Sequence, residues 1–122
     1  MSKLKSFKEL IVWQKAMELV KQVYTVTRRF PKEEMYGLTA QMRRASVSIA
    51  CNIAEGQSRN STGEFKQFLG ISKGSLAETE TLLILSNDLN LISSLELEKI
   101  TKATDEVGKL LNGLLNSLKT SG

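Results

Sequence analysis

The sequence predicts an all-α protein, an elongated antiparallel up-down-up-down four-helix bundle. Apolar residues recur at alternating spacings of three and four along successive stretches, which is the pattern of an amphipathic helix. Short polar segments rich in helix breakers separate these stretches, and short connections favour antiparallel neighbours. The predicted helices span residues 8–29, 34–57, 62–89 and 94–119, and together they form one domain over residues 1–122.

The first helix is predicted from an apolar stripe that stops before the only proline. Ser6, followed three residues later by Glu9, has the spacing of a capping box. Pro31 disfavours helical geometry at the residue before it, so we expect the helix to end by Arg29. The stripe consists of Leu10, Trp13, Met17, Val20, Tyr24 and Thr27, and it is widened by Ala16, Val23 and Phe30.

The second helix is apolar on two opposite sides. Gly37 is unfavourable inside a helix, so regular helix is expected from Leu38. The helix is expected to end at Gly56, Gln57 or Ser58, since Gly56 can act as a cap. The side assigned to the core carries Leu38, Met42, Ala45, Ile49 and Ile53. The opposite side carries Ala40, Val47, Ala50, Cys51 and Ala54. A helix that is apolar all round is normally covered all round, and one bundle of this size covers only one side, so the sequence predicts self-association.

The third helix also has a wide apolar sector, whereas the fourth has one apolar stripe and one polar face. Ser61 with Glu64, and Ser93 with Glu96, have capping-box spacing ahead of these two helices. The fourth helix is therefore expected on the outside of the bundle. We assign the outward side of the second helix to the oligomer interface. The third helix contributes Ile71, Leu82 and Leu85 to the same interface.

The composition argues against an enzyme. The chain has no His, which removes the commonest general base and transition-metal ligand, and it has no Gly-rich phosphate loop or cysteine cluster. We therefore expect no cofactor, no metal site and no small-molecule substrate. The lone Cys51 cannot form an intramolecular disulfide, and neither a signal peptide nor a membrane span is predicted, so a cytoplasmic protein is expected.

The net charge of +4 is compatible with binding to a polyanion. Guanidinium groups suit phosphate oxygens, and Arg43 with Arg44 would form a cationic ring if an oligomer repeated them. The alternative is that this pair forms salt bridges to Glu55 or Glu78, or lines a subunit interface. A solvated charge cluster is likewise the alternative for the basic residues near helix ends. The candidate nucleic-acid-binding residues are Arg43, Arg44, Arg28, Arg29, Lys32 and Arg59.

A buried polar network is predicted around Asn52, which lies in the core stripe of the second helix and needs hydrogen-bond partners there. Such a network more often fixes helix register than performs chemistry. Paired carboxylates acting in acid-base catalysis are disfavoured because the chain lacks histidine. Trp13 and Tyr24 lie on the apolar stripe, which favours a place in the core over stacking on nucleic-acid bases. The predicted network comprises Gln41, Asn52, Glu55, Ser75 and Glu78.

Several segments, taken together, resemble a known family, the 23S rRNA-intervening sequence proteins, which include the accessory variability proteins of diversity-generating retroelements. The segments occur in the family's order and spacing. They are Val12-Trp13-Gln14-Lys15-Ala16, Phe30-Pro31 with Glu34, Gly37-Leu38 with Gln41, Arg43-Arg44-Ala45, Ser48-Ile49, Asn52-Ile53-Ala54-Glu55-Gly56, and Gly74-Ser75 with Glu78.

The resemblance implies a cytoplasmic bacterial four-helix bundle that assembles as a ring of five identical subunits. In the retroelement branch it implies a reverse transcriptase and nucleic acid as partners; in the other branch the reading frame lies within ribosomal RNA genes. The resulting hypothesis is a non-enzymatic homopentameric scaffold that binds RNA or a nucleic-acid-processing protein. The alternative is a protein-binding adaptor that uses the apolar outward faces of the second and third helices.

Overall fold

The structure is a computed structural model that describes residues 6–118. Every regular element in that range is helical: α1 (Ile11–Thr27), α2 (Leu38–Gln57), α3 (Thr62–Asp88) and α4 (Ser94–Ser117), with short 3-10 helices η1 (Phe7–Glu9) and η2 (Lys32–Glu34). The predicted all-α class, with four long helices and no strand among these residues, is confirmed.

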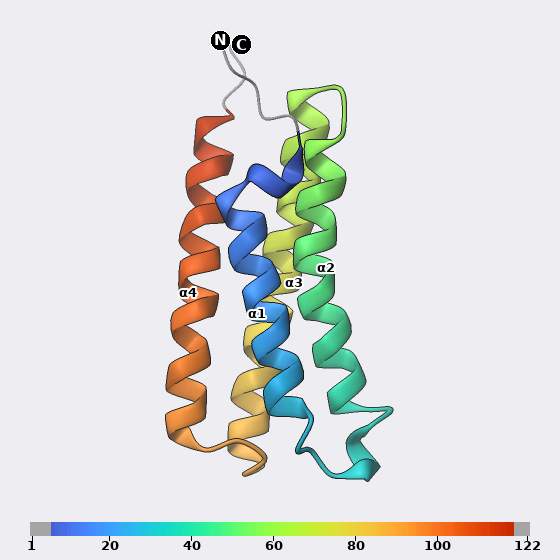
Figure 1. The fold of residues 1–122 in the computed structure, drawn as a ribbon, viewed down its shortest axis with the longest axis vertical. Coiled ribbons are helices and arrows are strands. Elements are labelled where there is room, and N and C mark those ends of the chain that lie inside the picture. The colour runs from blue at the N-terminus through green and yellow to red at the C-terminus, as the bar shows by residue number, and fades with distance from the viewer. Residues whose placement is uncertain (1–5, 119–122) are drawn as a thin grey trace.

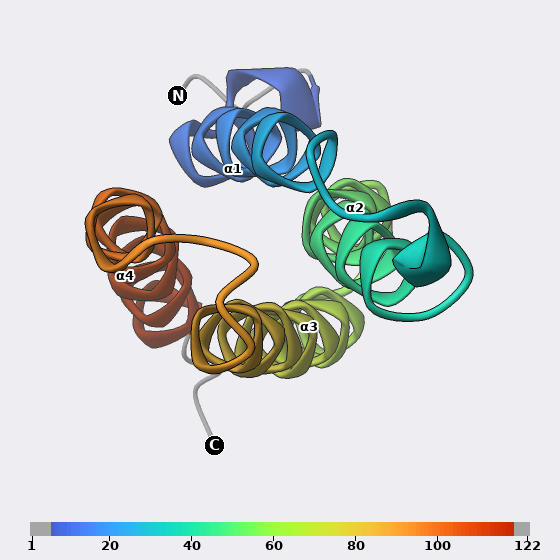
Figure 2. The same ribbon diagram turned by 90° about the horizontal axis from the view of Figure 1, so that it is seen from below.

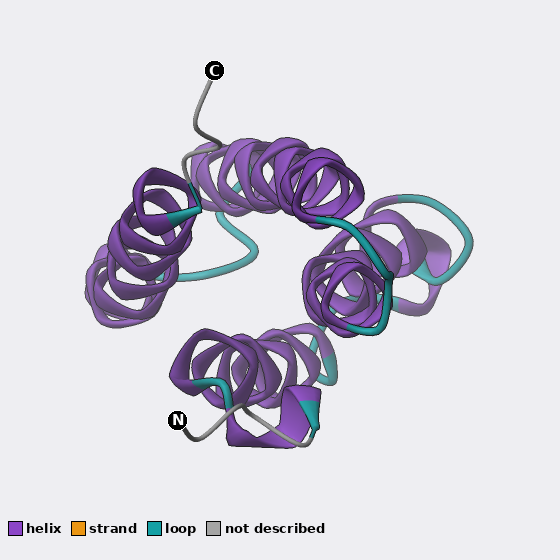
Figure 3. Ribbon diagram, turned by 90° about the horizontal axis from the view of Figure 1, so that it is seen from above, coloured by secondary structure: helices purple, strands orange, loops and turns teal. Residues whose placement is uncertain are grey.

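The helices stand side by side in an elongated molecule. Figure 1 shows α1 descending, α2 ascending, α3 descending and α4 ascending in the view. Seen from either end, the helices follow one another around the molecule, and α4 returns to the side of α1 (Figures 2 and 3). The 27 residues of α3 make it about 40 Å long.

The helix ends agree with the sequence prediction to within a few residues. α2 begins at Leu38, as expected from Gly37, because residues 34–37 belong to η2 and the turn after it. α1 begins later than predicted, because η1 precedes it. The predicted last residue of the fourth helix, 119, lies outside the described residues.

Side-chain caps start α3 and α4 as predicted. Ser61 Oγ accepts a hydrogen bond from the backbone N–H of Glu64 at 3.1 Å. Ser93 Oγ accepts from the N–H of Glu96 at 3.0 Å, and the Glu96 carboxylate accepts from the N–H of Ser93 at 2.9 Å, so this capping box is complete. Ser6 instead caps η1, so its predicted role at the start of the first long helix is wrong.

The buried side of α1 is centred toward the residues expected to widen the stripe and away from Tyr24. Ala16, Leu19 and Val23 are fully buried, whereas Trp13 is half-buried and Tyr24 is 37% exposed. α1 packs against α2 on one side and α4 on the other (Figure 2), so the residues between those two contacts are covered most completely. The prediction that Tyr24 belongs to the core is therefore wrong.

α2 and α3 form the closest helix pair in the molecule. Gly56 is buried in the last turn of α2, and a Cβ built there would lie 2.8 Å from the Cβ of Phe68. α2 ends at Gln57, within the predicted range of Gly56 to Ser58, and its C-cap is Ser58 and not Gly56. Farther along the pair, Ser72 Oγ donates to the carbonyl of Ile49 at 2.9 Å. Small residues on both helices thus allow the two backbones to approach.

Candidate functional site

Arg43 connects two helices and is not a free surface cation. Its Nε donates to Thr27 Oγ1 at 2.9 Å, and its guanidinium carbon lies 4.4 Å from the centroid of the Tyr24 ring. Thr27 is buried, and its hydroxyl donates to the carbonyl of Val23 at 2.7 Å. Arg43 therefore joins α2 to the end of α1 through a hydrogen bond and a cation–π contact.

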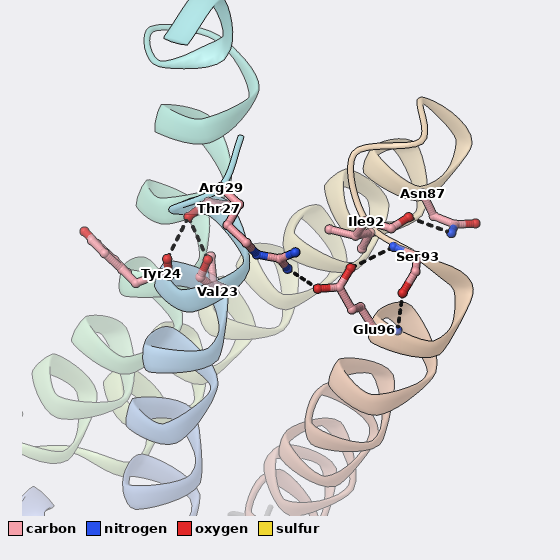
Figure 4. Close-up of polar contacts among 8 residues, drawn as sticks. All are labelled: Val23, Tyr24, Thr27, Arg29, Asn87, Ile92, Ser93 and Glu96. Carbon is pink, nitrogen blue, oxygen red and sulfur yellow. Dashed lines mark hydrogen bonds and ion pairs between the residues drawn. The ribbon is translucent and has the colours of Figure 1, made fainter. Parts of the chain in front are cut away.

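Arg29 is also engaged, by the start of α4. Figure 4 shows its side chain reaching from beyond the end of α1 to Glu96 in the first turn of α4, where Nη2 bonds Oε2. The backbone N–H of Ser93 and the guanidinium of Arg29 lower the pKa of Glu96 below its ordinary value, since both stabilise the carboxylate. Glu96 therefore caps α4 and links it to α1 at the same time.

Arg59 pairs with Glu55 one turn earlier, with Nη2 at 2.9 Å from Oε2. Its guanidinium carbon also lies 4.7 Å from the centroid of the Phe68 ring. Glu55 thus forms a salt bridge to Arg59, and the suggested salt bridge from Arg43 or Arg44 to Glu55 is absent among residues 6–118.

The predicted basic residues do not form one surface. Arg28, Lys32 and Arg44 are exposed and have no ion pair or hydrogen bond from their side chains within the described part of the chain. Lys32 precedes α2 and Arg59 follows it, and the 20 residues of α2 span about 30 Å. The charges are thus distributed along the bundle.

The outward side of α2 retains most of the residues predicted for an oligomer interface. Ala40, Val47 and Ala54 are half-buried in the single chain, and Cys51 is exposed. The assignment of Ala50 to the interface is wrong, because Ala50 is only 3% exposed and belongs to the chain's own core. Its side chain points toward the neighbouring helices of the bundle and not away from them.

The outward side of α3 carries exposed apolar side chains. Ile71 is 47% exposed and Leu85 is 42% exposed. Leu82, predicted for the same interface, is 8% exposed and packs in the core, so that assignment is wrong. Gly70 and Gly74 present no side chain on this helix, and a Cβ added at either would meet nothing within 4 Å among the described residues.

The predicted polar network is smaller and less buried than expected. Asn52 Nδ2 donates to Ser48 Oγ at 3.0 Å, and Ser48 Oγ lies 2.8 Å from Ser75 Oγ, so three half-buried side chains link α2 to α3. Sequence reasoning missed Ser48. The other predicted members are Gln41, Glu55 and Glu78. Their side chains are exposed at the edge of the helix pair, so the prediction that they are buried is wrong.

Two of these exposed side chains line a groove of about 450 Å³ between α2 and α3. Gln41 and Arg44 come from α2 and Glu78 comes from α3, and the hydrogen-bonded Ser48 and Ser75 also contribute. Arg44 and Glu78 form no ion pair with one another. The groove therefore carries one charge of each sign.

A second cleft, of about 440 Å³, lies between α1 and α4. Lys21, Thr25 and Arg29 recur every four residues along the α1 side, and Glu96 and Lys99 come from α4. Sequence reasoning missed Lys21 and Lys99, because a lysine on the polar side of a helix carries no motif. The four-residue spacing along α1 was the available signal.

Residues 6–118 contain no group of three or more Cys, Asp or Glu side chains placed to hold a metal ion. None of the helices in this range has both the length and the apolar character that crossing a membrane requires.

Comparisons with known proteins agree with this architecture. A family model described as 23S rRNA-intervening sequence protein matches residues 8–113. A crystal structure from Bacteroides thetaiotaomicron, described as a protein with unknown function from the S23 ribosomal protein family, has a TM-score of 0.80 and 24% sequence identity. The alignment covers 86% of this chain and 98% of that chain, and at this identity it shows the fold alone. A search of curated proteins finds no match.

Proposed function

This chain belongs to the 23S rRNA-intervening sequence protein family, and we propose that it is a non-enzymatic homo-oligomeric scaffold that binds RNA. The observation that carries the proposal is the pair of outward faces on α2 and α3. Exposed apolar surface of this kind marks interaction sites in soluble proteins.

The two faces differ from one another, which favours a ring. The α2 face consists of small side chains around Val47, and the α3 face combines Ile71 and Leu85 with the bare backbone of Gly70 and Gly74. When one face of a subunit packs on a different face of the next, the assembly closes into a ring if the rotation allows. A ring of five subunits is the assembly that we propose.

Symmetry would multiply the charge that each subunit contributes. Each chain carries a net charge of +4, so five copies carry 5 × 4, or +20. Arg28, Lys32 and Arg44 remain free of intramolecular ion pairs in the described chain. A weak contact repeated around a ring gains strength from multivalency, so modest basic sites suffice for RNA binding.

The test combines light scattering with RNA titration. We expect a mass of five chains, and binding to structured RNA that weakens steeply with salt because counterions are released on binding. Titrations at two salt concentrations measure the slope. No RNA binding at low salt, or binding that does not respond to salt, would overturn the RNA-binding part; a monomeric mass would overturn the scaffold.

The alternative function is a protein-binding adaptor, which the same apolar faces support. In that case the α2 and α3 faces are open in the free protein and bind a different chain. A stable monomer in light scattering, combined with no affinity for RNA, would favour the adaptor over the scaffold.

A further inference from the structure

The α1–α4 cleft holds more positive charge than the chain itself neutralises. Lys21, Arg29 and Lys99 line it, and Glu96 is its single carboxylate. Neither lysine has an ion pair or a side-chain hydrogen bond within residues 6–118. Counting these four groups, the cleft keeps a net charge of +2 (three cations less one carboxylate).

Both oxygens of that carboxylate are already engaged. Glu96 Oε1 accepts from the backbone N–H of Ser93 at 2.9 Å, and Oε2 accepts from Nη2 of Arg29 (Figure 4). Within the described residues, Arg29 bonds through this one nitrogen alone, and a guanidinium has five N–H donors. The cleft therefore has amine and guanidinium donors left over, and no further carboxylate lines it to satisfy them.

We propose that this cleft binds a phosphate group of the RNA backbone. The inference rests on the proposed RNA-binding function and assigns a site to it. Ammonium and guanidinium donors match phosphate oxygens. Beside them the cleft has an apolar wall of Val26 and Ile100, suited to a ribose, and the side-chain amide of Gln22.

The position of the cleft is compatible with the proposed ring. Viewed from below, α1 and α4 lie on the side of the bundle opposite α2 and α3 (Figure 2). Packing the outward faces of α2 and α3 against neighbouring subunits would leave the α1–α4 cleft open. Arg43 and Arg59 are occupied by contacts within the chain, so Lys21 and Lys99 are the stronger candidates for contact with phosphate.

The test compares two double variants with the same change in charge. Lys21→Gln with Lys99→Gln removes two charges from the cleft, and Lys8→Gln with Lys109→Gln removes two from exposed positions outside it. Arg29 is left intact because it also links α1 to α4. All four lysines lie toward the surface, and circular dichroism checks that both variants keep their helix content.

We expect the cleft variant to bind structured RNA about tenfold more weakly at low salt and to have a shallower salt dependence, since it loses phosphate contacts. The control variant should lose much less affinity. Equal losses in the two variants would overturn the cleft assignment while leaving RNA binding intact. Absence of RNA binding by the unmodified protein would instead overturn the proposed function.

Discussion

At the scale of single residues, Glu96 has two tasks that depend on its negative charge. It completes the capping box of α4 through the N–H of Ser93, and it pairs with Arg29 beyond the end of α1. A carboxylate in the first turn of a helix is also favoured by the helix dipole. The contacts with Ser93 and Arg29 both stabilise the ionised carboxylate, and they therefore lower the pKa of Glu96.

Replacing Glu96 tests both tasks. Glu96→Ala should lower the free energy of unfolding by about 1 kcal/mol at pH 7, as expected for a lost cap. Glu96→Gln should cost less, because its amide oxygen still accepts from the Ser93 N–H. Glu98→Ala, at an exposed position in the same turn, is the control and should change stability by less than about 0.5 kcal/mol.

The pH dependence of this effect has a definite sign. Because the pKa of Glu96 is lowered from 4.5 in the folded protein, the unfolded chain binds the proton more readily. The stabilisation is therefore complete above pH 4.5 and is lost as the pH falls through the lower, folded-state pKa. Urea unfolding of the protein and of Glu96→Ala should show a difference in stability at pH 7 that shrinks as the pH falls below 4.5. A difference that does not change with pH would contradict a role for the ionised carboxylate.

At the scale of helices, the contact between α2 and α3 depends on the absence of a side chain at Gly56. The Cβ position there lies 2.8 Å from the Cβ of Phe68 and 3.2 Å from the carbonyl oxygen of Phe65. Neither atom is the end of a flexible side chain, so relief requires the two helices to move apart. Glycine has a low helix propensity, but at this position it allows the two helices to approach closely.

Gly56→Ala should therefore destabilise the protein by about 1 to 3 kcal/mol, since overpacking exceeds the gain in helix propensity. Gly113→Ala is the matched control in α4, where a Cβ meets nothing within 4 Å among the described residues. The control should be stabilised by up to about 1 kcal/mol. Chemical denaturation of both variants measures the difference. Stabilisation of Gly56→Ala to the same extent as the control would show that the helix pair tolerates the methyl group.

At the scale of the whole molecule, the apolar faces of α2 and α3 set the expected assembly. Their side chains are half-buried or exposed in the single chain, whereas the faces toward the other helices are covered. Of the basic groups proposed to contact RNA that form no ion pair within residues 6–118, Lys21 and Lys99 lie in the α1–α4 cleft, Arg44 lies in the α2–α3 groove, and Arg28 and Lys32 lie beyond the end of α1. In the proposed scaffold, one side of each bundle assembles and the other binds.

Val47→Glu should dissociate the oligomer while helix content is kept, because the new carboxylate would be buried at the subunit contact without a partner. Leu95→Glu introduces the same charge at a 71% exposed position outside both faces, and it should leave the assembly unchanged. Light scattering gives the mass, and circular dichroism gives the helix content. Loss of helix content in Val47→Glu would place this side chain in the core of its own chain.

Much of the fold could be predicted from local signals. Ser61 and Ser93 cap helices because a hydroxyl beside a helix start satisfies a free N–H. The start of α2 at Leu38 follows from the low helix propensity of Gly37. The candidate site was less predictable. Which cations pair with which acids depends on residues far apart in the chain, as Arg29 and Glu96 show.

The chain's own residue pattern was enough to establish four amphipathic helices, their approximate ends and the surplus of apolar surface on the second and third. These properties depend on neighbours within a few positions, where periodicity and capping act. Helix packing in three dimensions placed Ala50 and Leu82 in the core, shifted the centre of the buried side of α1 and brought Lys21 and Lys99 to one cleft. The physical reason is that rotation and spacing of a helix are set by all of its partners at once, and no single helix encodes them.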